Sequence, residues 1–216
     1  MPFGPIDPAT TLCGLCRRLQ PPYVKATAYG SYESGLRELI HLLKYEQVRP
    51  AANVLGRMLA EAIADLRDSF QAAQVLVVPV PLHSRKQRQR GYNQAELIAS
   101  AAVKQMAGGR FEMSAGILQR RRETQSQIGL SSHQRRENIR GAFAVARPEA
   151  IAKREILLVD DVFTTGTTVS ECTRVLRRAG ASKVYVATVA RTLKYEVQQA
   201  ELKPAMPATF TMAAAG

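Results

Sequence analysis

Residues 156–168 constrain the fold of this chain more than any other segment. Four apolar residues at 156–159 precede two acids, Asp160 and Asp161, and a run rich in Thr and Gly follows. A short apolar run of this kind predicts a strand buried on both faces of a parallel sheet. The Thr and Gly residues open a predicted helix that ends at Gly180, and residues 183–190 form the next predicted strand. This βαβ unit predicts an α/β protein with a right-handed crossover.

The chain before this unit has the periodicity of further helices and strands. Apolar residues at i, i+3, i+4 and i+7 predict two amphipathic helices separated by Pro50. Residues 75–80 are apolar and rich in Val, which predicts a second buried strand, followed by a basic loop and a helix over residues 93–106. Short strands are predicted near 117–118 and 142–145, with a polar loop and a short helix between them.

These elements predict one principal domain over residues 35–195. Residues 1–34 are rich in turn formers and are predicted to be an irregular N-terminal appendage. Residues 196–216 have an Ala, Pro and Met composition without a period, which predicts a low-complexity, disordered tail.

The two acids and the Thr/Gly run have the composition of a ribose phosphate site. Ligands of open α/β sheets bind beyond the carboxyl ends of the strands, and the start of a helix offers unpaired N–H groups to a phosphate. Adjacent carboxylates are acceptors suited to vicinal hydroxyls. The predicted ribose-5-phosphate site consists of Asp160, Asp161, Thr164, Thr165, Gly166, Thr167 and Thr168. The plain alternative is that one Thr merely caps the helix while the acids lie in solvent.

Residues 156–168 resemble the phosphoribosyl pyrophosphate signature of the type I phosphoribosyltransferases. A second segment, Val-Pro-Val-Pro-Leu-His at 78–83 followed by Arg-Gly-Tyr-Asn-Gln at 90–94, resembles the hallmark of the ComF family of competence-associated and GntX-like proteins. The resemblance covers roughly residues 29–192. It implies the type I phosphoribosyltransferase fold, with a mostly parallel central sheet flanked by helices. It also implies that Asp160 and Asp161 hold the ribose hydroxyls as the catalytic pair.

Two basic segments complete the site that this resemblance implies. Four cations fall within six residues of the predicted loop after the second strand, where type I enzymes keep their pyrophosphate loop. The predicted pyrophosphate-binding residues are Arg85, Lys86, Arg88 and Arg90. The mobile loop that closes over the ligand is expected to include Arg120, Arg121 and Arg122. The alternatives are a solvated basic loop and a merely exposed connection.

The charge of the chain agrees with an anionic ligand. Lys and Arg number 30 against 18 Asp and Glu, which gives a formal net charge of +12. Between residues 75 and 140, basic residues outnumber acidic ones by 12 to 4, so much of the excess lies in the two basic segments. A ligand with a phosphate and a pyrophosphate requires such a concentration of charge, and the same patch would steer a nucleic acid towards the site.

Composition also bears on location and on metals. No apolar run approaches the roughly 18 residues of a membrane helix, so we expect no membrane insertion. Three cysteines and no export signal favour the cytoplasm over a disulfide framework. Cys13 and Cys16 form half of a zinc site, which we interpret as an incomplete zinc-ribbon remnant without Zn²⁺. Cys172 shares a helical face with Val169 and Leu176, so it is expected in the core.

Two functions follow from these patterns. The first is a Mg²⁺-dependent phosphoribosyltransferase that uses phosphoribosyl pyrophosphate with an unknown acceptor. The second is a non-catalytic or regulatory ComF-type protein, which binds a phosphoribosylated ligand and handles single-stranded DNA with the competence machinery. A homodimer is left open for either function.

Overall fold

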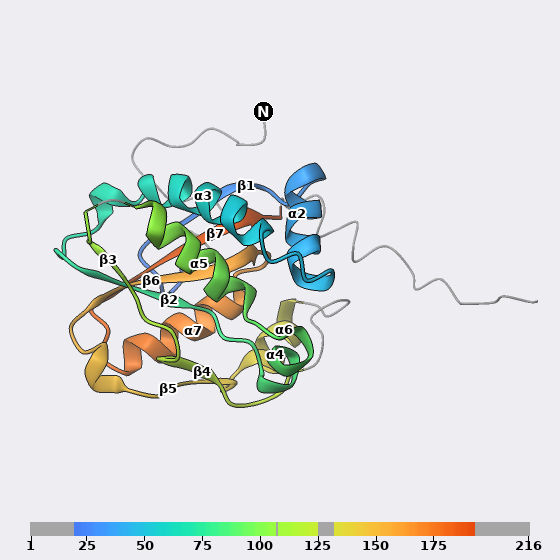
Figure 1. Ribbon diagram of the computed structural model, residues 1–216. Helices are drawn as coiled ribbons and strands as arrows, with labels where there is room; N and C mark the ends of the chain where they lie inside the picture. The colour runs from blue at the N-terminus through green and yellow to red at the C-terminus, as the bar shows by residue number, and fades with distance from the viewer. Residues whose placement is uncertain (1–19, 107, 125–131, 193–216) are drawn as a thin grey trace, which may run out of the picture.

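A computed structural model describes residues 20–106, 108–124 and 132–192. Its centre is a five-stranded parallel sheet in the order β1-β7-β6-β2-β3 (Figure 1). The strands are β1 (Ala26–Ser31), β2 (Val75–Pro79), β3 (Phe111–Met113), β6 (Glu155–Phe163) and β7 (Lys183–Arg191). The predicted βαβ unit is confirmed, because β6 and β7 pair in parallel across the helix α7 (Thr167–Arg178).

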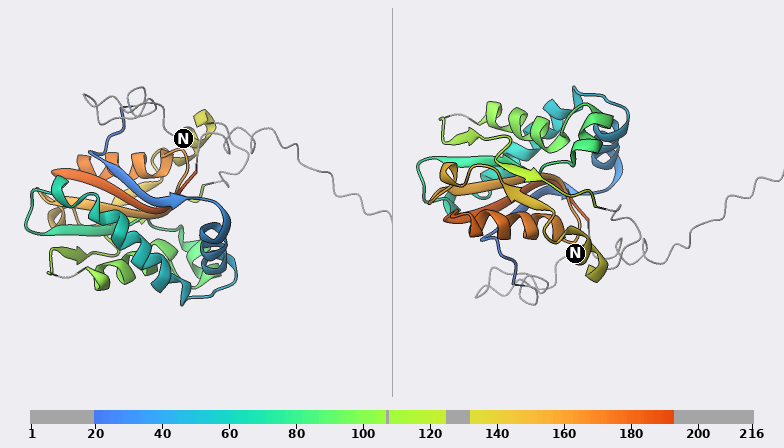
Figure 2. Two further views of the ribbon diagram at one scale, coloured as in Figure 1. Left: turned by 90° about the horizontal axis from the view of Figure 1, so that it is seen from above. Right: turned by 90° about the horizontal axis from the view of Figure 1, so that it is seen from below.

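Successive side chains of the central strands point to opposite faces of the sheet, which divides the core into two layers. Val77 and Leu157 pack on one face with helices α2 (Ser34–Tyr45), α3 (Ala51–Ala64) and α5 (Gln94–Gln105). Their neighbours Val78 and Leu158 pack on the other face, which α7 covers. This period of two explains the continuous apolar runs, since strands covered on both sides need apolar residues at every position. The two views in Figure 2 show helices on both faces of the sheet.

Helices α3 and α5 approach closely because Gly56 lies at their contact. A Cβ atom at this position would lie 2.5 Å from the Cβ atom of Ala101. On the opposite face, Cys172 is fully buried on α7, which confirms its predicted place in the core.

A smaller unit lies at the edge of this framework. Strands β4 (Leu118–Arg120) and β5 (Phe143–Val145) pair antiparallel, and helix α6 (Ser132–Ile139) lies between them in the chain, as predicted. Single 3-10 turns occur at η1 (Arg67–Ser69) and η2 (Pro148–Ala150).

The predicted basic loop is wrong, because its cations lie on a helix, α4 (Ser84–Arg90). Arg, Lys and Gln are good helix formers, and they outweigh the loop expected from the motif's position. The side chain of His83 accepts a hydrogen bond from the Arg85 amide, and Gly91 ends the helix with a φ of +80°. Consequently the four cations are held by a helix rather than by an extended loop.

The N-terminal segment also differs in part from its prediction. Residues 26–31 were expected to be irregular, but they form the edge strand β1 and pair with β7 in register from Ala26 to Ser31. Cys13, Cys16 and the predicted tail lie outside the described residues. None of the helices in the described ranges has the length and apolarity required to span a membrane.

Candidate functional site

The predicted site residues gather at the carboxyl end of the sheet. Strand β6 carries Asp160 and Asp161 near its carboxyl end, and α7 begins six residues after the second acid. Helices α2, α4 and α6 also lie at this end in Figure 1. Segments distant in the sequence therefore converge beside the acidic pair.

The start of α7 has the backbone geometry of an anion site. Its N-cap is Gly166, with a φ of +72°, and no side chain caps the helix. The alternative in which a Thr only caps this helix is therefore wrong. The hydroxyls of Thr165 and Thr167 lie 2.8 Å apart on either side of the glycine. The first N–H groups of a helix have no partner within the helix, so they are available to a ligand.

The two acids lie within β6 rather than after it, so their side chains point to opposite sides of the strand. Asp161 is 5% exposed, and its Oδ2 atom lies 2.8 Å from the Nζ atom of Lys44. Asp160 is partly exposed and accepts a hydrogen bond of 2.9 Å from the backbone amide of Asp161. The acids therefore have different surroundings, although they are adjacent in the sequence.

Their electrostatics differ accordingly. Burial, followed by the negative charge of Asp161, raises the pKa of Asp160 to about 7, while Lys44 and Arg120 act in the opposite direction. Burial alone would lower the pKa of Lys44, but the charge of Asp161, its hydrogen bond and the charge of Asp160 raise it. Asp160 is thus a carboxyl that titrates near neutrality, and Lys44 remains charged.

The cations of α4 have different electrostatic surroundings. Arg85 is largely exposed and lies 3.6 Å from Glu123. Arg90 donates to Gln94 at 2.7 Å. Partial burial and the charges of Arg120 and Arg90 lower the pKa of Lys86. Crowded cations of this kind would gain from a bound anion, which relieves their mutual repulsion.

The predicted mobile loop has a fixed base. Arg120 on β4 lies over the ring of Phe143 and donates to Thr124, and it acts electrostatically on Asp160. Arg122 donates to the backbone carbonyls of residues 138 and 140, each at 2.9 Å, and thereby holds the end of α6. Arg121 is exposed. Only Arg120 of the three is thus coupled to the acidic pair.

Sequence reasoning missed Lys44. It stands four residues after Ile40 and next to Leu43, so it falls on the buried side of α2, where an apolar residue is expected. A lysine at an apolar position was the available signal. No cluster of three or more His, Cys, Asp or Glu side chains suited to a metal occurs among the residues that the structure describes.

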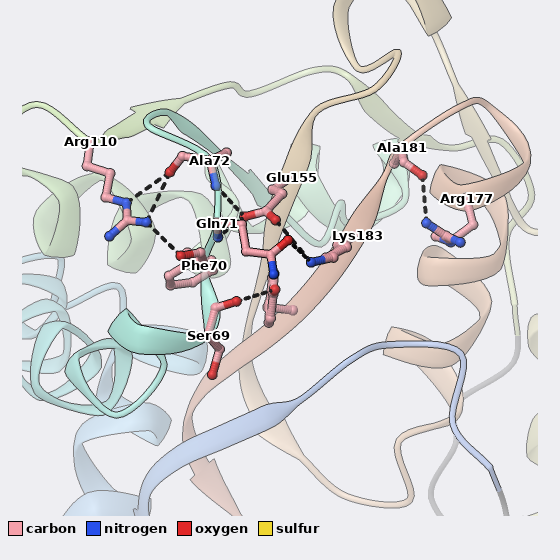
Figure 3. Close-up of polar contacts among 10 residues, drawn as sticks. Ser69, Phe70, Gln71, Ala72, Arg110, Glu155, Arg177, Ala181 and Lys183 are labelled. Carbon is pink, nitrogen blue, oxygen red and sulfur yellow. Dashed lines mark hydrogen bonds and ion pairs between the residues drawn. The ribbon is translucent and has the colours of Figure 1, made fainter.

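A third acid of β6 provides a useful contrast. Glu155, at the amino end of the strand, accepts from the amides of Gln71 at 3.0 Å and Ala72 at 3.1 Å, and Lys183 lies 3.7 Å away (Figure 3). Its hydrogen bonds hold the segment that follows η1 at the start of β6, and its ion pair holds the start of β7 there. The carboxylate oxygens of Glu155 are therefore occupied by contacts within the fold, whereas those of Asp160 can accept further hydrogen bonds from a ligand.

Comparisons with known proteins show the family of the domain. The model of the phosphoribosyl transferase domain matches residues 53–207. Competence protein F of Haemophilus influenzae is 33% identical over 83% of this chain and 78% of its own length. DNA utilization protein YhgH of Escherichia coli K12 is 32% identical over 84% of this chain and 78% of its own.

A solved structure with the same kind of domain is the hypoxanthine phosphoribosyltransferase of Staphylococcus aureus. It is 14% identical, covers 65% of this chain and 64% of its own, and gives a TM-score of 0.40. The sheet order and the family match give the fold class.

Proposed function

The chain belongs to the phosphoribosyl transferase domain family, in its ComF group, and on that premise we propose that it binds phosphoribosyl pyrophosphate with Mg²⁺ and transfers the phosphoribosyl group to an acceptor. The predicted fold class, an α/β type I phosphoribosyltransferase fold with a parallel central sheet, is confirmed. The observation that most supports the ligand is the glycine start of α7 beside the acidic end of β6.

The 5′-phosphate is assigned to the first turn of α7. Gly166 lets the backbone approach the phosphate, and the N–H groups of residues 164–168 and the helix dipole favour negative charge. The hydroxyls of Thr165 and Thr167 supply further donors at the same point. Thr164 and Thr168 are assigned to this cradle with them.

The ribose is assigned to the acidic pair, with Asp160 in direct contact. Its oxygens accept only one hydrogen bond from the described residues, so they can accept from the 2′- and 3′-hydroxyls. Asp161 supports this contact through its amide, which orients the Asp160 carboxylate.

The pyrophosphate is assigned to the cations of α4. The charges of Arg120, Arg90 and Lys44 all act on Lys86, whereas Arg85 is engaged with Glu123. We therefore expect Lys86 and Arg90 to contribute most, and Arg85 and Arg88 to contribute through long-range attraction.

The carboxylate of Asp160 also fits Mg²⁺, which prefers oxygen ligands and takes one or two carboxylates together with substrate phosphates. When bound with the ligand, Mg²⁺ would supply charge neutralisation to the departing pyrophosphate. The bond between the anomeric carbon and the pyrophosphate oxygen breaks, and its electron pair leaves with pyrophosphate. The acceptor forms the new bond from its lone pair, and its proton passes to a base.

A second candidate function is the handling of single-stranded DNA without catalysis. Two curated relatives are named for competence and for DNA utilization. On this chain, Tyr45 is 63% exposed, and the guanidinium of Arg90 lies 5.5 Å from its ring centre. An exposed aromatic ring beside cations is the usual platform for stacked bases.

An assay of pyrophosphate release separates the two functions. With phosphoribosyl pyrophosphate, Mg²⁺ and a panel of nucleobases and amines, the catalytic proposal predicts release that Asp160→Asn abolishes. No pyrophosphate release with any acceptor, together with salt-dependent DNA binding that is retained in Asp160→Asn, would favour the second function. Either function includes a cytoplasmic location, which fractionation of cells would test.

A further inference from the structure

Lys44 places a charged ammonium group at the carboxyl end of the sheet. Helix α2 buries Ile40 and Leu43 in the core, which fixes the position of its last turn. The Nζ atom of Lys44 then lies 2.8 Å from Oδ2 of Asp161, with side chains that are 18% and 7% exposed. The pair is largely removed from water and lies beside the proposed ligand.

The fold alone does not account for this pair. At the other end of β6, Glu155 joins Lys183 but also accepts two backbone amides, so it ties three segments together. Among the residues that the structure describes, Lys44 is the one ion-pair partner of Asp161. The Glu155 cluster therefore links separate segments of the fold, whereas the Lys44–Asp161 pair links only α2 to β6.

We propose that Lys44 is a positioning residue of the phosphoribosyl site, which neutralises Asp161 so that Asp160 alone presents negative charge to the anionic ligand. This inference rests on the proposed function. Without the ammonium group, the carboxylate of Asp161 would add uncompensated negative charge next to Asp160, near a ligand that has a phosphate and a pyrophosphate. Like charges at short range in a poorly hydrated site repel strongly.

The inference has a specific consequence for Mg²⁺. A divalent cation bound with the ligand adds positive charge at the same place, so it compensates in part for a missing ammonium group. Lys44→Met keeps the length of the side chain and removes its charge. We expect this variant to bind phosphoribosyl pyrophosphate about 10- to 100-fold more weakly at low Mg²⁺, with a smaller loss at high Mg²⁺.

Two further variants distinguish neutralisation from other roles. In Lys44→Met/Asp161→Asn the uncompensated carboxylate is gone, so binding should recover relative to Lys44→Met. Lys183→Met removes the lysine of β7 that pairs with Glu155 at the opposite end of β6, and it should leave the affinity unchanged. The double variant also keeps the test valid if the single variant folds poorly, since it contains no unpaired buried charge.

The experiment is a calorimetric titration of phosphoribosyl pyrophosphate into the full chain and the three variants, at low and high Mg²⁺, with thermal unfolding as the check on folding. The inference is supported if Lys44→Met binds weakly, if high Mg²⁺ reduces its loss of affinity, and if Lys44→Met/Asp161→Asn recovers the affinity. Equal binding by Lys44→Met and the native chain, or no recovery in the double variant, overturns it. If the native chain itself fails to bind, the proposed function is wrong instead.

Discussion

A Cβ atom on Gly166 would lie 2.7 Å from the ring of Phe163, at the point where β6 turns into α7. The backbone there has a φ of +72°, which side chains other than glycine rarely adopt. Two constraints therefore require glycine at the same residue, and both lie in the proposed phosphate cradle.

Gly166→Ala is expected to destabilise the protein and to weaken phosphate binding together. The left-handed backbone alone costs about 1–2 kcal/mol, and displacement of the Phe163 ring adds to this. Chemical denaturation measures the first effect and ligand titration the second. Gly35→Ala is the matched control, because a Cβ atom there meets nothing within 4 Å. A native-like Gly166→Ala would contradict the tight turn.

The stability of the fold should depend on pH through Asp160. Its pKa is raised in the folded protein, to about 7 from an ordinary value of 3.8, so the folded state holds this proton more tightly than the unfolded chain does. This contribution to stability is complete below about pH 4 and is lost as the pH rises through 7.

Asp160→Asn should remove that dependence. The variant is expected to be more stable than the native chain at pH 8, with a difference that shrinks as the pH falls towards 4. Thermal unfolding across this range measures it. Parallel curves for the two proteins would show that Asp160 does not titrate in this window.

Glu155 provides a test of stability without function. Glu155→Ala leaves two backbone amides without their acceptor and Lys183 without its ion-pair partner, and the loss is expected to be about 2–4 kcal/mol of unfolding free energy. Chemical denaturation measures this loss. The affinity of the folded variant for phosphoribosyl pyrophosphate should equal that of the native chain, and a large change in affinity would mean that the amino end of β6 reaches the site.

The cations of α4 should contribute unequally. Lys86→Ala relieves the crowding around Arg90 and Arg120 but removes a proposed contact, so the affinity for pyrophosphate should fall by about tenfold. Arg85→Ala, at a position that is 74% exposed, should have a several-fold smaller effect. Titrations with inorganic pyrophosphate compare them, and equal losses would mean that α4 attracts the ligand only through its total charge.

The sequence was sufficient for the central strands and for α7, because strands covered on both faces need unbroken apolar runs such as 156–159. Strand β1 was missed since Ala26–Ser31 lacks such a run, and its strand structure depends on pairing with β7. Helix α4 was not predicted, because the position of its cations after a strand in the motif indicated a loop, whereas their residue types favour a helix.

The composition of the site was predictable, but its internal division was not. The Thr/Gly start of α7 and the two acids follow from local pattern. Asp160 and Asp161 have different surroundings because β6 continues through both of them, so their side chains point to opposite sides. The partner of Asp161 comes from α2, a distant segment of the chain. Local sequence contains no information on that contact beyond a lysine at an apolar position.

The end of β6 and the start of α7 are proposed to form a phosphoribosyl pyrophosphate site. Calorimetric titration of that ligand with Mg²⁺ into the native chain and into Asp160→Asn tests it most directly. We expect saturable binding at one site per native chain and a loss of at least tenfold in affinity for Asp160→Asn. Absence of binding by the folded native chain, or equal affinity in the two proteins, would contradict it.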